Sequence, residues 1–401
     1  MKILIVSQYF YPEEFRINDL AFDLVKRGHE VTVLTGNPNY PKGEFYKGYG
    51  FKFAHENYMG VNIYRIPIIP RGNASGIRLA LNYLSFAING SIFALFFRQK
   101  FNVAFVFAIS PITVVYPALV HKWIFKTKVI LWVQDLWPES VSAAGKMKSS
   151  LAAMILTKMV KQIYNLSDKV LVQSEAFIQP VTDKGVTAQQ LRYVPNWAED
   201  LFCNNSNVSK LKYKDIIPDG FKVMFAGNIG EAQDFDSIFK AAELTKQFPE
   251  IKWIFIGDGR KKSWAEGEIV RLKLEKSVFL LGRYPSEEMP AFFVHADIML
   301  LSLKDENIFS MTIPTKVQSY LAFGKPIAGM LNGIGADVIQ KADCGYVANA
   351  ADYRSLANNI VTAYKEDPLF LLKKGLNGQK YYLENFSKEV IIDNMIRIFQ
   401  E

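Results

Sequence analysis

A short turn in the second half of the chain has the composition of a phosphate-binding loop. It follows the apolar run 222–226 and contains Gly227, Asn228, Ile229 and Gly230. Small residues let backbone N–H groups approach a phosphate, and a helix expected at 235–246 adds the positive end of its dipole. Glycine can also serve such turns for steric reasons alone. Because the turn has no lysine, a phosphate there would depend on backbone donors or on a distant cation.

Lys316 is the candidate for that cation. It follows Pro314 and Thr315 at the start of an expected helix, where a hydroxyl, free amides and an ammonium come together. A lysine in a first helical turn works against the helix dipole, so an anionic ligand would explain its place. The alternative is a solvated surface lysine.

Acidic and aromatic residues in the first half could recognise a sugar hydroxyl. Asp135, Trp137 and Glu139 follow the apolar run 128–133. Carboxylates accept hydrogen bonds and indoles stack on apolar sugar faces, although a capped helix start is the alternative. Two other loops at strand ends add the candidates Glu13, Arg16, Asn39 and Tyr40.

The sequence has no pattern typical of a metal or dinucleotide site. The four histidines are scattered, and Cys203 and Cys344 have neither metal nor redox spacing, which favours a reducing compartment. There is no HExxH motif and no Walker lysine, and Gly257-Asp258-Gly259 alone is not a dinucleotide fingerprint. We therefore expect no metal or other cofactor.

Two series of apolar runs would position these candidates. The predicted strands are 2–7, 30–35, 62–66, 103–108, 128–133 and 169–173, then 222–226, 252–256, 277–281, 297–302 and 326–330. Continuous apolar runs are typical of parallel strands covered on both faces, and the polar stretch 196–220 fits a linker. For 401 residues this predicts an α/β chain of two Rossmann-like domains facing each other across a cleft.

The positive charge is concentrated in one segment. The net charge is +8, and between Asn57 and Gln134 lie eight Lys and Arg without any Asp or Glu. Within that segment, 79–97 is uncharged, with Arg78, Asn82, Ser85 and Asn89 recurring at helical spacing as a narrow polar stripe. A helix lying in the membrane interface, a buried core helix and a transmembrane span all remain open. The basic flanks favour contact with an anionic membrane surface, and we expect no nucleic-acid partner.

The chain resembles the retaining GT-B glycosyltransferases of family GT4, and among them the bacterial N-acetyl-L-fucosamine transferases of O-antigen and capsule assembly. The segments that carry this resemblance, which spans nearly the full length, are RGHEVTVLT at 27–35, NPNYP at 37–41, WVQDLWPES at 132–140, PNW at 195–197, GNIG at 227–230, GDG at 257–259, PTK at 314–316 and GKP at 324–326.

The resemblance implies that the two domains bind different substrates. Residues 1–197 would bind the acceptor, with a membrane-contacting segment around 76–101, and 205–385 would bind a UDP-sugar. The helix at 386–401 would cross back to the first domain. The diphosphate of the UDP-sugar would contact the 227–230 turn, Gly257 and Lys316. Its uracil base would bind near Arg283 and Tyr284.

The sequence departs from the family pattern at the second glutamate of a pair that many members carry. Ser319 occupies that position, with Gln318 beside it, and Glu306 is the candidate substitute for the first glutamate. Lys316 would stabilise the leaving diphosphate, whereas Asp135 or Glu13 would orient the acceptor hydroxyl.

The resemblance implies transfer of a sugar from UDP to an undecaprenyl-diphosphate-linked saccharide. N-acetyl-L-fucosamine is the first choice for this sugar, and N-acetylglucosamine and N-acetylgalactosamine are the alternatives. The protein would act at the cytoplasmic face of the inner membrane, as a peripheral or monotopic protein. The alternatives are a UDP-sugar 2-epimerase, which would leave the basic apolar segment unexplained, and an inactive membrane-bound scaffold, suggested by the missing glutamates.

Overall fold

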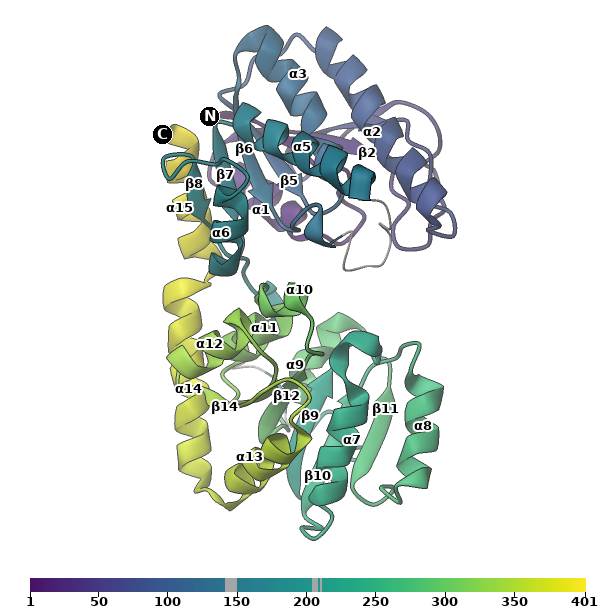
Figure 1. Cartoon of the computed structure of the whole chain (residues 1–401), viewed down its shortest axis with the longest axis vertical. Coiled ribbons are helices and arrows are strands. Elements are labelled where there is room, and N and C mark those ends of the chain that lie inside the picture. Colours follow the sequence, from purple (N-terminus) through teal and green to yellow (C-terminus); the bar gives the residue numbers. More distant parts are fainter. Residues whose placement is uncertain (141–149, 204–207, 210) are drawn as a thin grey trace. The chain divides into compact units, whose positions relative to one another are not determined.

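The computed structural model describes residues 1–140, 150–203, 208–209 and 211–401. These form two compact units, shown in Figure 1: unit 1 is Met1–Val194 with Met395–Glu401, and unit 2 is Pro195–Asn394. Parts of the predicted linker 196–220 and of the segment that follows Glu139 lie outside the described residues.

Unit 1 is built on a sheet with strand order β3-β4-β2-β1-β5-β6-β7-β8, parallel except for the β3–β4 pair. The strands are β1 (Lys2–Val6), β2 (Glu30–Gly36), β3 (Ala54–Tyr58), β4 (Val61–Ile66), β5 (Val103–Ala108), β6 (Lys128–Val133), β7 (Lys169–Val172) and β8 (Leu191–Tyr193). The helices are α1 (Arg16–Lys26), α2 (Gly76–Phe96), α3 (Tyr116–Phe125), α5 (Ser150–Leu166), α6 (Ile178–Thr182) and the end of α15 (Lys388–Gln400).

Unit 2 has a fully parallel sheet of order β11-β10-β9-β12-β13-β14. The strands are β9 (Phe221–Ala226), β10 (Ile251–Ile256), β11 (Val278–Gly282), β12 (Ile298–Ser302), β13 (Ile327–Met330) and β14 (Gly345–Ala348). The helices are α7 (Phe235–Leu244), α8 (Lys262–Arg271), α9 (Met289–Phe293), α10 (Asn307–Ser310), α11 (Thr315–Phe323), α12 (Ile334–Lys341), α13 (Tyr353–Lys365) and α14 (Pro368–Asn385).

The prediction of two Rossmann-like domains is confirmed. The central strands are buried along their whole length, as β5 illustrates, because helices cover both faces of the sheet. Sequence reasoning missed β3, β8 and β14. These three are short strands at the edges of their sheets, where one side has no neighbouring strand and a long apolar run is not required.

Helix α2 has two different faces. Two asparagines of its polar stripe pack on unit 1 itself: the Asn82 amide donates to the Ile69 carbonyl at 2.6 Å, and the Asn89 amide donates to the Pro67 carbonyl at 2.7 Å. Arg78, at the start of the stripe, is exposed. The apolar side chains on its other side are exposed, namely Ile77, Leu81, Leu84, Ile88, Ile92, Leu95 and Phe96. The helix is long and apolar enough to cross a membrane by length and composition alone, yet only 33% of its most apolar stretch is buried in the protein.

Candidate functional site

The candidate donor site lies in unit 2, where the strand order reverses. Strands β9 and β12 are neighbours, but the chain leaves them toward opposite edges of the sheet. The helices that follow them therefore diverge, and ligands of open parallel sheets bind in the resulting crevice at the carboxyl ends of the strands. Ala226 ends β9 and Ser302 ends β12, so the predicted turn 227–230 begins at this point.

Tight backbone contacts shape the turn. The Gly227 amide donates to the Ile256 carbonyl at 2.8 Å, and the Ile229 amide donates to the Asp258 carbonyl at 2.9 Å. A Cβ on Gly257 would lie 1.8 Å from the Gly227 carbonyl oxygen, so only glycine fits there. The turns after β9 and β10 thus lie directly against each other.

Lys316 lies at the same turn. A Cβ on Gly227 would come within 2.7 Å of the Lys316 Nζ, and this ammonium lies 3.6 Å from the centroid of the Phe225 ring. Among the described residues, no carboxylate forms an ion pair with Lys316. Burial lowers its pKa to about 7. The structure therefore places a cation that has no counter-ion among the described residues against a glycine turn, 89 positions away in the sequence.

This environment predicts a pH dependence for nucleotide binding. Because a diphosphate favours the protonated amine, UDP should bind tightly at pH values below the pKa of Lys316, which is about 7 in the free protein. At higher pH its affinity should fall progressively. We expect the Kd for UDP to rise about tenfold between pH 7.5 and 9.0, a range in which the diphosphate of UDP is almost fully ionised and its uracil ring stays largely neutral. Calorimetric titration across this range measures the effect. A Kd independent of pH would contradict it.

The other predicted donor residues have varied surroundings. The amide of Gln318 is buried and donates to the Asn196 carbonyl at 2.6 Å, and the Ser319 hydroxyl donates to the Thr315 carbonyl at 3.1 Å. Asn228, Arg283, Glu306 and Thr315 are exposed. Tyr284 packs against the ring of Phe292, with centroids 4.7 Å apart. Of the donor candidates, the structure brings together the 227–230 turn, Gly257 and Lys316.

An ion-pair cluster that sequence reasoning missed borders the turn. The Glu231 carboxylate pairs with Lys304 at 2.9 Å and with Lys261 at 3.3 Å, and Lys261 also pairs with Asp236 at 3.1 Å. These contacts join the turn to the segments after β10 and β12. No sequence motif indicates them, because the four residues come from three different βα connections, after β9, β10 and β12.

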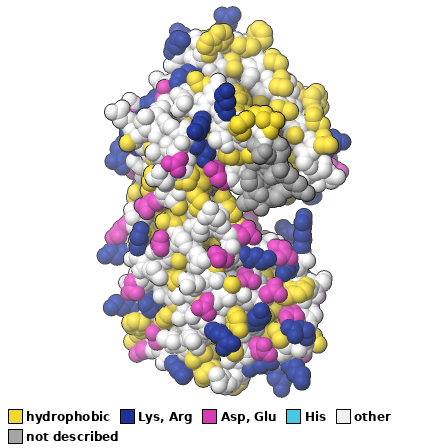
Figure 2. All heavy atoms as spheres, in the orientation of Figure 1, with side chains coloured by type: hydrophobic (Ala, Val, Ile, Leu, Met, Phe, Trp, Pro, Cys, Tyr) yellow, Lys and Arg dark blue, Asp and Glu magenta, His cyan; other side chains and the backbone are white. Residues whose placement is uncertain are grey.

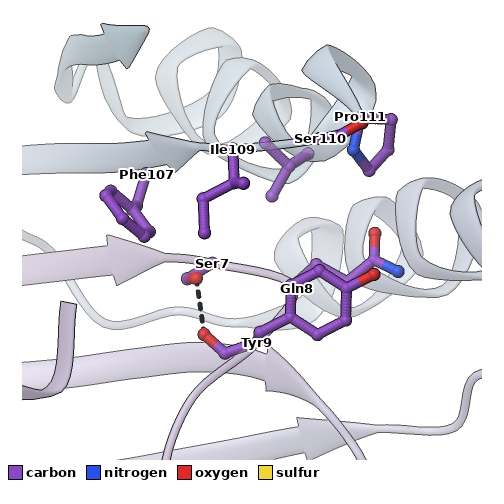
Figure 3. Close-up of a pocket in the computed structure, with 8 residues that line it drawn as sticks. Ser7, Gln8, Tyr9, Phe107, Ile109, Ser110 and Pro111 are labelled. Atoms are coloured by element: carbon purple, nitrogen blue, oxygen red, sulfur yellow. Dashed lines mark hydrogen bonds between the residues drawn. The ribbon is translucent and has the colours of Figure 1, made fainter. Parts of the chain in front are cut away.

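In unit 1 the strand order also reverses, between β1 and β5, and a small hollow opens there. Figure 3 shows its lining, which comprises Ser7, Gln8, Tyr9, Phe107, Ile109, Ser110, Pro111 and Val114. The Gln8 amide donates to the Asn82 side chain of α2 at 2.6 Å. The hollow is therefore connected to the buried Asn82 of α2.

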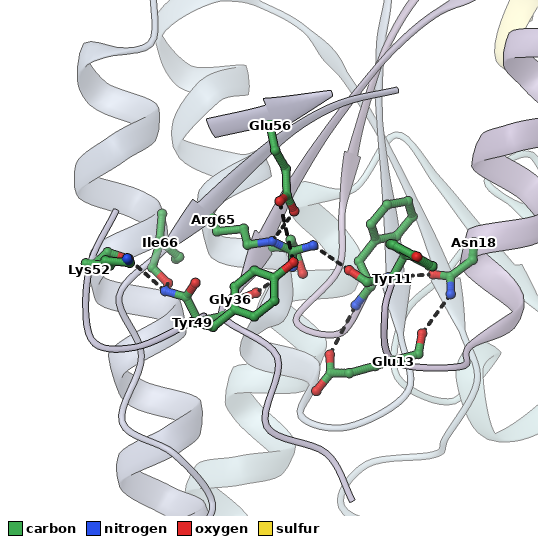
Figure 4. A network of polar contacts seen from close by, with 12 residues as sticks. Tyr11, Glu13, Asn18, Gly36, Tyr49, Lys52, Glu56, Arg65 and Ile66 are labelled. Carbon is green, nitrogen blue, oxygen red and sulfur yellow. Dashed lines mark hydrogen bonds and ion pairs between the residues drawn. The ribbon is translucent and has the colours of Figure 1, made fainter. Parts of the chain in front are cut away.

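Glu13 is buried and organises the loops around it. One carboxylate oxygen accepts the backbone amides of Asn39 at 2.8 Å and Tyr40 at 2.7 Å, and the other accepts the Phe10 amide at 3.3 Å. Burial raises the pKa of Glu13 to about 7, although these amides act in the opposite direction. Figure 4 shows Glu13 within a wider polar network. Its carboxylate holds two loops together, so we assign it a positioning role.

Asp135 lies just after β6 and is only partly buried. Burial raises its pKa to about 6, against the lowering influence of the Ser140 hydroxyl and the Trp137 indole. The Glu139 carboxylate, in contrast, pairs with the buried Lys184 ammonium at 2.5 Å. Asp135 is therefore ionised at neutral pH and accessible, whereas Glu139 is engaged in an ion pair.

The remaining acceptor candidates lie on the first two loops of unit 1. Arg16 is the first residue of α1, and Tyr40 is 39% exposed. Asn39 is buried, and its side-chain oxygen accepts the backbone amide of Arg71 at 3.0 Å. Arg71 was not predicted from the sequence. No group of three or more His, Cys, Asp or Glu among the described residues could hold a metal ion.

Comparison with known proteins identifies the family. Residues 14–197 match the family "Glycosyl transferase 4-like domain", and residues 210–374 match "Glycosyl transferases group 1". The two matches correspond to the two units and together account for most of the chain. The chain therefore belongs to the GT4-like glycosyltransferases of the GT-B fold, and it is an enzyme of that class.

Individual relatives agree with this assignment. The chain is 25% identical over 340 residues to the Escherichia coli K12 colanic acid biosynthesis protein WcaI, covering 81% of this chain and 82% of WcaI. The fold matches sucrose-phosphate synthase from Thermosynechococcus elongatus, with a TM-score of 0.73, 16% identity and coverage of 100% and 98%. It also matches Anabaena HepE in complex with UDP and glucose, with a TM-score of 0.66, 16% identity and full coverage of both chains.

Proposed function

We propose that this glycosyltransferase moves a sugar from a UDP-sugar to a saccharide carried on undecaprenyl diphosphate, in the synthesis of a capsule or O-antigen polysaccharide. The observation that carries the proposal is the Lys316 ammonium against the Gly227 turn, without a carboxylate partner among the described residues. The relationship to WcaI supports a role in polysaccharide synthesis, and the HepE complex supports UDP as the nucleotide. The sequence resemblance favours N-acetyl-L-fucosamine as the transferred sugar.

The chemistry follows from charge development on the leaving group. As the bond between the sugar and UDP breaks, the diphosphate gains negative charge, and Lys316 with the amides of the 227–230 turn would stabilise it. A cation in this position would perform the task that a metal ion performs in other transferases, so we propose transfer without a metal. The resemblance to retaining GT4 enzymes is the basis for proposing that the stereochemistry of the sugar is retained. In unit 1, Asp135 would accept the hydrogen bond of the acceptor hydroxyl and orient it.

The apolar side of α2 suggests that the enzyme binds its acceptor at a membrane surface. Figure 2 shows apolar side chains gathered over α2, α3 and α5, with Lys and Arg beside them. The exposed members on the last two helices include Trp123, Leu151, Met154 and Ile155. We propose that this surface, called here the apolar face of unit 1, lies in the cytoplasmic leaflet of the inner membrane. Because the Asn82 and Asn89 amides donate to the carbonyls of 67–69, we favour a helix in the interface over a span.

Nucleotide selectivity tests the donor half of the proposal. In EDTA, UDP is expected to raise the Tm by several degrees, and GDP and dTDP by much less, because only a ligand of the native state stabilises it. Differential scanning fluorimetry measures the shift. Absence of a shift with any nucleotide would favour the inactive scaffold, and conversion of a UDP-sugar without any acceptor would favour a 2-epimerase.

Replacing Asp135 by Asn tests the acceptor half. The rate of transfer should fall about 10²-fold with the KM for the UDP-sugar unchanged, because the amide can no longer accept the hydrogen bond as a charged group. In the wild type, activity should also decline as the pH falls below about 6, where the Asp135 carboxylate is protonated. Steady-state assays with a lipid-linked acceptor measure both effects. Unchanged kinetics would exclude this role for Asp135.

A further inference from the structure

The loop before α2 carries an arginine with unused hydrogen-bonding capacity. The Arg71 guanidinium lies 5.7 Å from the Tyr9 ring centroid and 5.2 Å from that of Tyr40, and its Nη1 donates to the Tyr9 hydroxyl at 2.5 Å. A guanidinium has five N–H donors, and this is the only hydrogen bond of the Arg71 guanidinium to the described residues. No described carboxylate forms an ion pair with it.

The neighbouring Arg65 shows what a purely structural arginine looks like in this fold. It is fully buried, and all three of its nitrogens donate: Nε to Glu56 at 2.5 Å, Nη1 to the Gly36 carbonyl at 3.3 Å, and Nη2 to the Tyr11 carbonyl. Figure 4 shows this closed network. Arg71 is only partly buried, and within the described part of the chain its guanidinium contacts neither a carboxylate nor a carbonyl. Its donors are therefore available to a ligand.

The surroundings hold Arg71 in place before any ligand arrives. Its backbone amide donates to the Asn39 side chain at 3.0 Å, and the buried Glu13 fixes the backbone of Asn39. The Gly72 amide donates to the Gly43 carbonyl at 2.8 Å, which joins the same two loops again. Tyr9 and Tyr40 themselves pack together, with ring centroids 5.7 Å apart. A guanidinium preorganised in this way loses little conformational entropy on binding.

The Tyr9 hydroxyl adds a further donor. Burial raises the pKa of Tyr9, so its hydroxyl stays protonated and can donate while it accepts from Arg71. Tyr9 also lines the hollow between β1 and β5, as Figure 3 shows. Clustered donors with a fixed positive charge match the oxygens of a phosphate, which guanidinium groups bind in a bidentate manner. The acid-free segment 57–134 adds to the positive potential.

We propose that Arg71, with Tyr9 and Tyr40, forms a phosphate subsite that holds the diphosphate of the lipid-linked acceptor. The subsite lies five residues before α2, whose apolar side is exposed, so a lipid tail in the membrane and a phosphate at Arg71 are geometrically compatible. The proposal deepens the proposed function and rests on it. It assigns recognition of the acceptor's phosphate to unit 1, separately from recognition of the donor's phosphate by Lys316.

The direct test is binding of farnesyl diphosphate and farnesol in detergent micelles, with saturating UDP to occupy the donor site. Arg71→Gln should weaken farnesyl diphosphate binding about tenfold or more, since a hydrogen bond to a charged group contributes roughly 1.5–3 kcal/mol. Farnesol binding should not change. Tyr9→Phe, which keeps the ring, should cause a smaller loss. Arg98→Gln is the matched control, because it removes one charge at the other end of α2.

Three results with farnesyl diphosphate and farnesol would overturn the subsite. They are an equal loss in Arg98→Gln, no loss in Arg71→Gln and Tyr9→Phe, and equal losses for the diphosphate and farnesol. If Arg71→Gln weakens binding to phosphatidylglycerol vesicles as much as to farnesyl diphosphate, Arg71 contacts lipid headgroups instead, and this result also overturns the subsite.

In transfer assays, Arg71→Gln should raise the KM for the acceptor and not that for the UDP-sugar. Failure of UDP binding in the wild type would count against the proposed function, independently of these binding results.

Discussion

Replacing Lys316 by Gln is expected to lower kcat/KM for transfer by about 10²–10³-fold, the range typical of removing one group that stabilises a developing anion. The amide keeps much of the side chain's length but has no charge at the Gly227 turn. UDP binding should weaken as well, because the Lys316 ammonium is a cation without a carboxylate partner among the described residues. Loss of the UDP-induced rise in Tm, together with initial-rate kinetics, measures both effects.

Lys304→Gln provides the matched control for this result. Lys304 also lies beside the turn, but its ammonium is paired with Glu231 at 2.9 Å and its side chain is 35% exposed. Exposed ion pairs of this kind contribute little, so UDP binding should change by less than about fivefold. Equal losses in the two variants would indicate a general effect of positive charge near the turn. That outcome would contradict a specific role for Lys316.

The double variant Leu84→Glu, Ile88→Glu is expected to reduce binding to anionic vesicles about 100-fold or more. The two side chains are 52% and 56% exposed on the apolar face of unit 1. If each contributes about 1.5 kcal/mol of apolar burial in the membrane, their loss corresponds to two orders of magnitude, and the new charges add repulsion from the lipid headgroups. Sedimentation with vesicles containing phosphatidylglycerol measures the partition.

The control for the membrane experiment lies on α14 in unit 2. Leu372 and Leu376 have the same spacing and are 54% and 53% exposed, so Leu372→Glu, Leu376→Glu makes an equivalent change in charge and apolar area elsewhere. This control should bind vesicles like the wild type. If both double variants lose binding equally, the apolar face of unit 1 has no special role. Wild-type protein that does not sediment with vesicles would contradict the membrane assignment itself.

Much of the fold follows from local sequence patterns. Parallel strands buried on both faces need continuous apolar runs, and the predicted runs match β1, β2 and β5 closely. The turn at Gly227 was found from composition for a related reason, because a strand followed by glycines and a helix is a local pattern. The class of enzyme could be predicted as well, since its motifs occur in a fixed order along the chain.

The partners of polar side chains could not be predicted in this way. Gln318 lies beside the position of a missing glutamate and was a candidate for donor binding, and the structure shows its amide donating to a carbonyl 122 residues away. Glu13 was a candidate for contact with the acceptor, and the structure places both of its oxygens against backbone amides. A side chain's partner depends on which loops the fold brings together, which local composition does not encode.

The sequence by itself therefore determined the central parallel strands of the two sheets, the glycine turn, the lysine that follows Pro314 and the concentration of positive charge before residue 134. Only the tertiary structure decided that Lys316 lies against Gly227, that the asparagines of the α2 polar stripe face their own domain, and that Arg71 is held between two tyrosines. The reason is physical. Backbone conformation and apolar patterning act over a few residues, whereas electrostatic partners and exposure are set by contacts between segments that are distant in the chain.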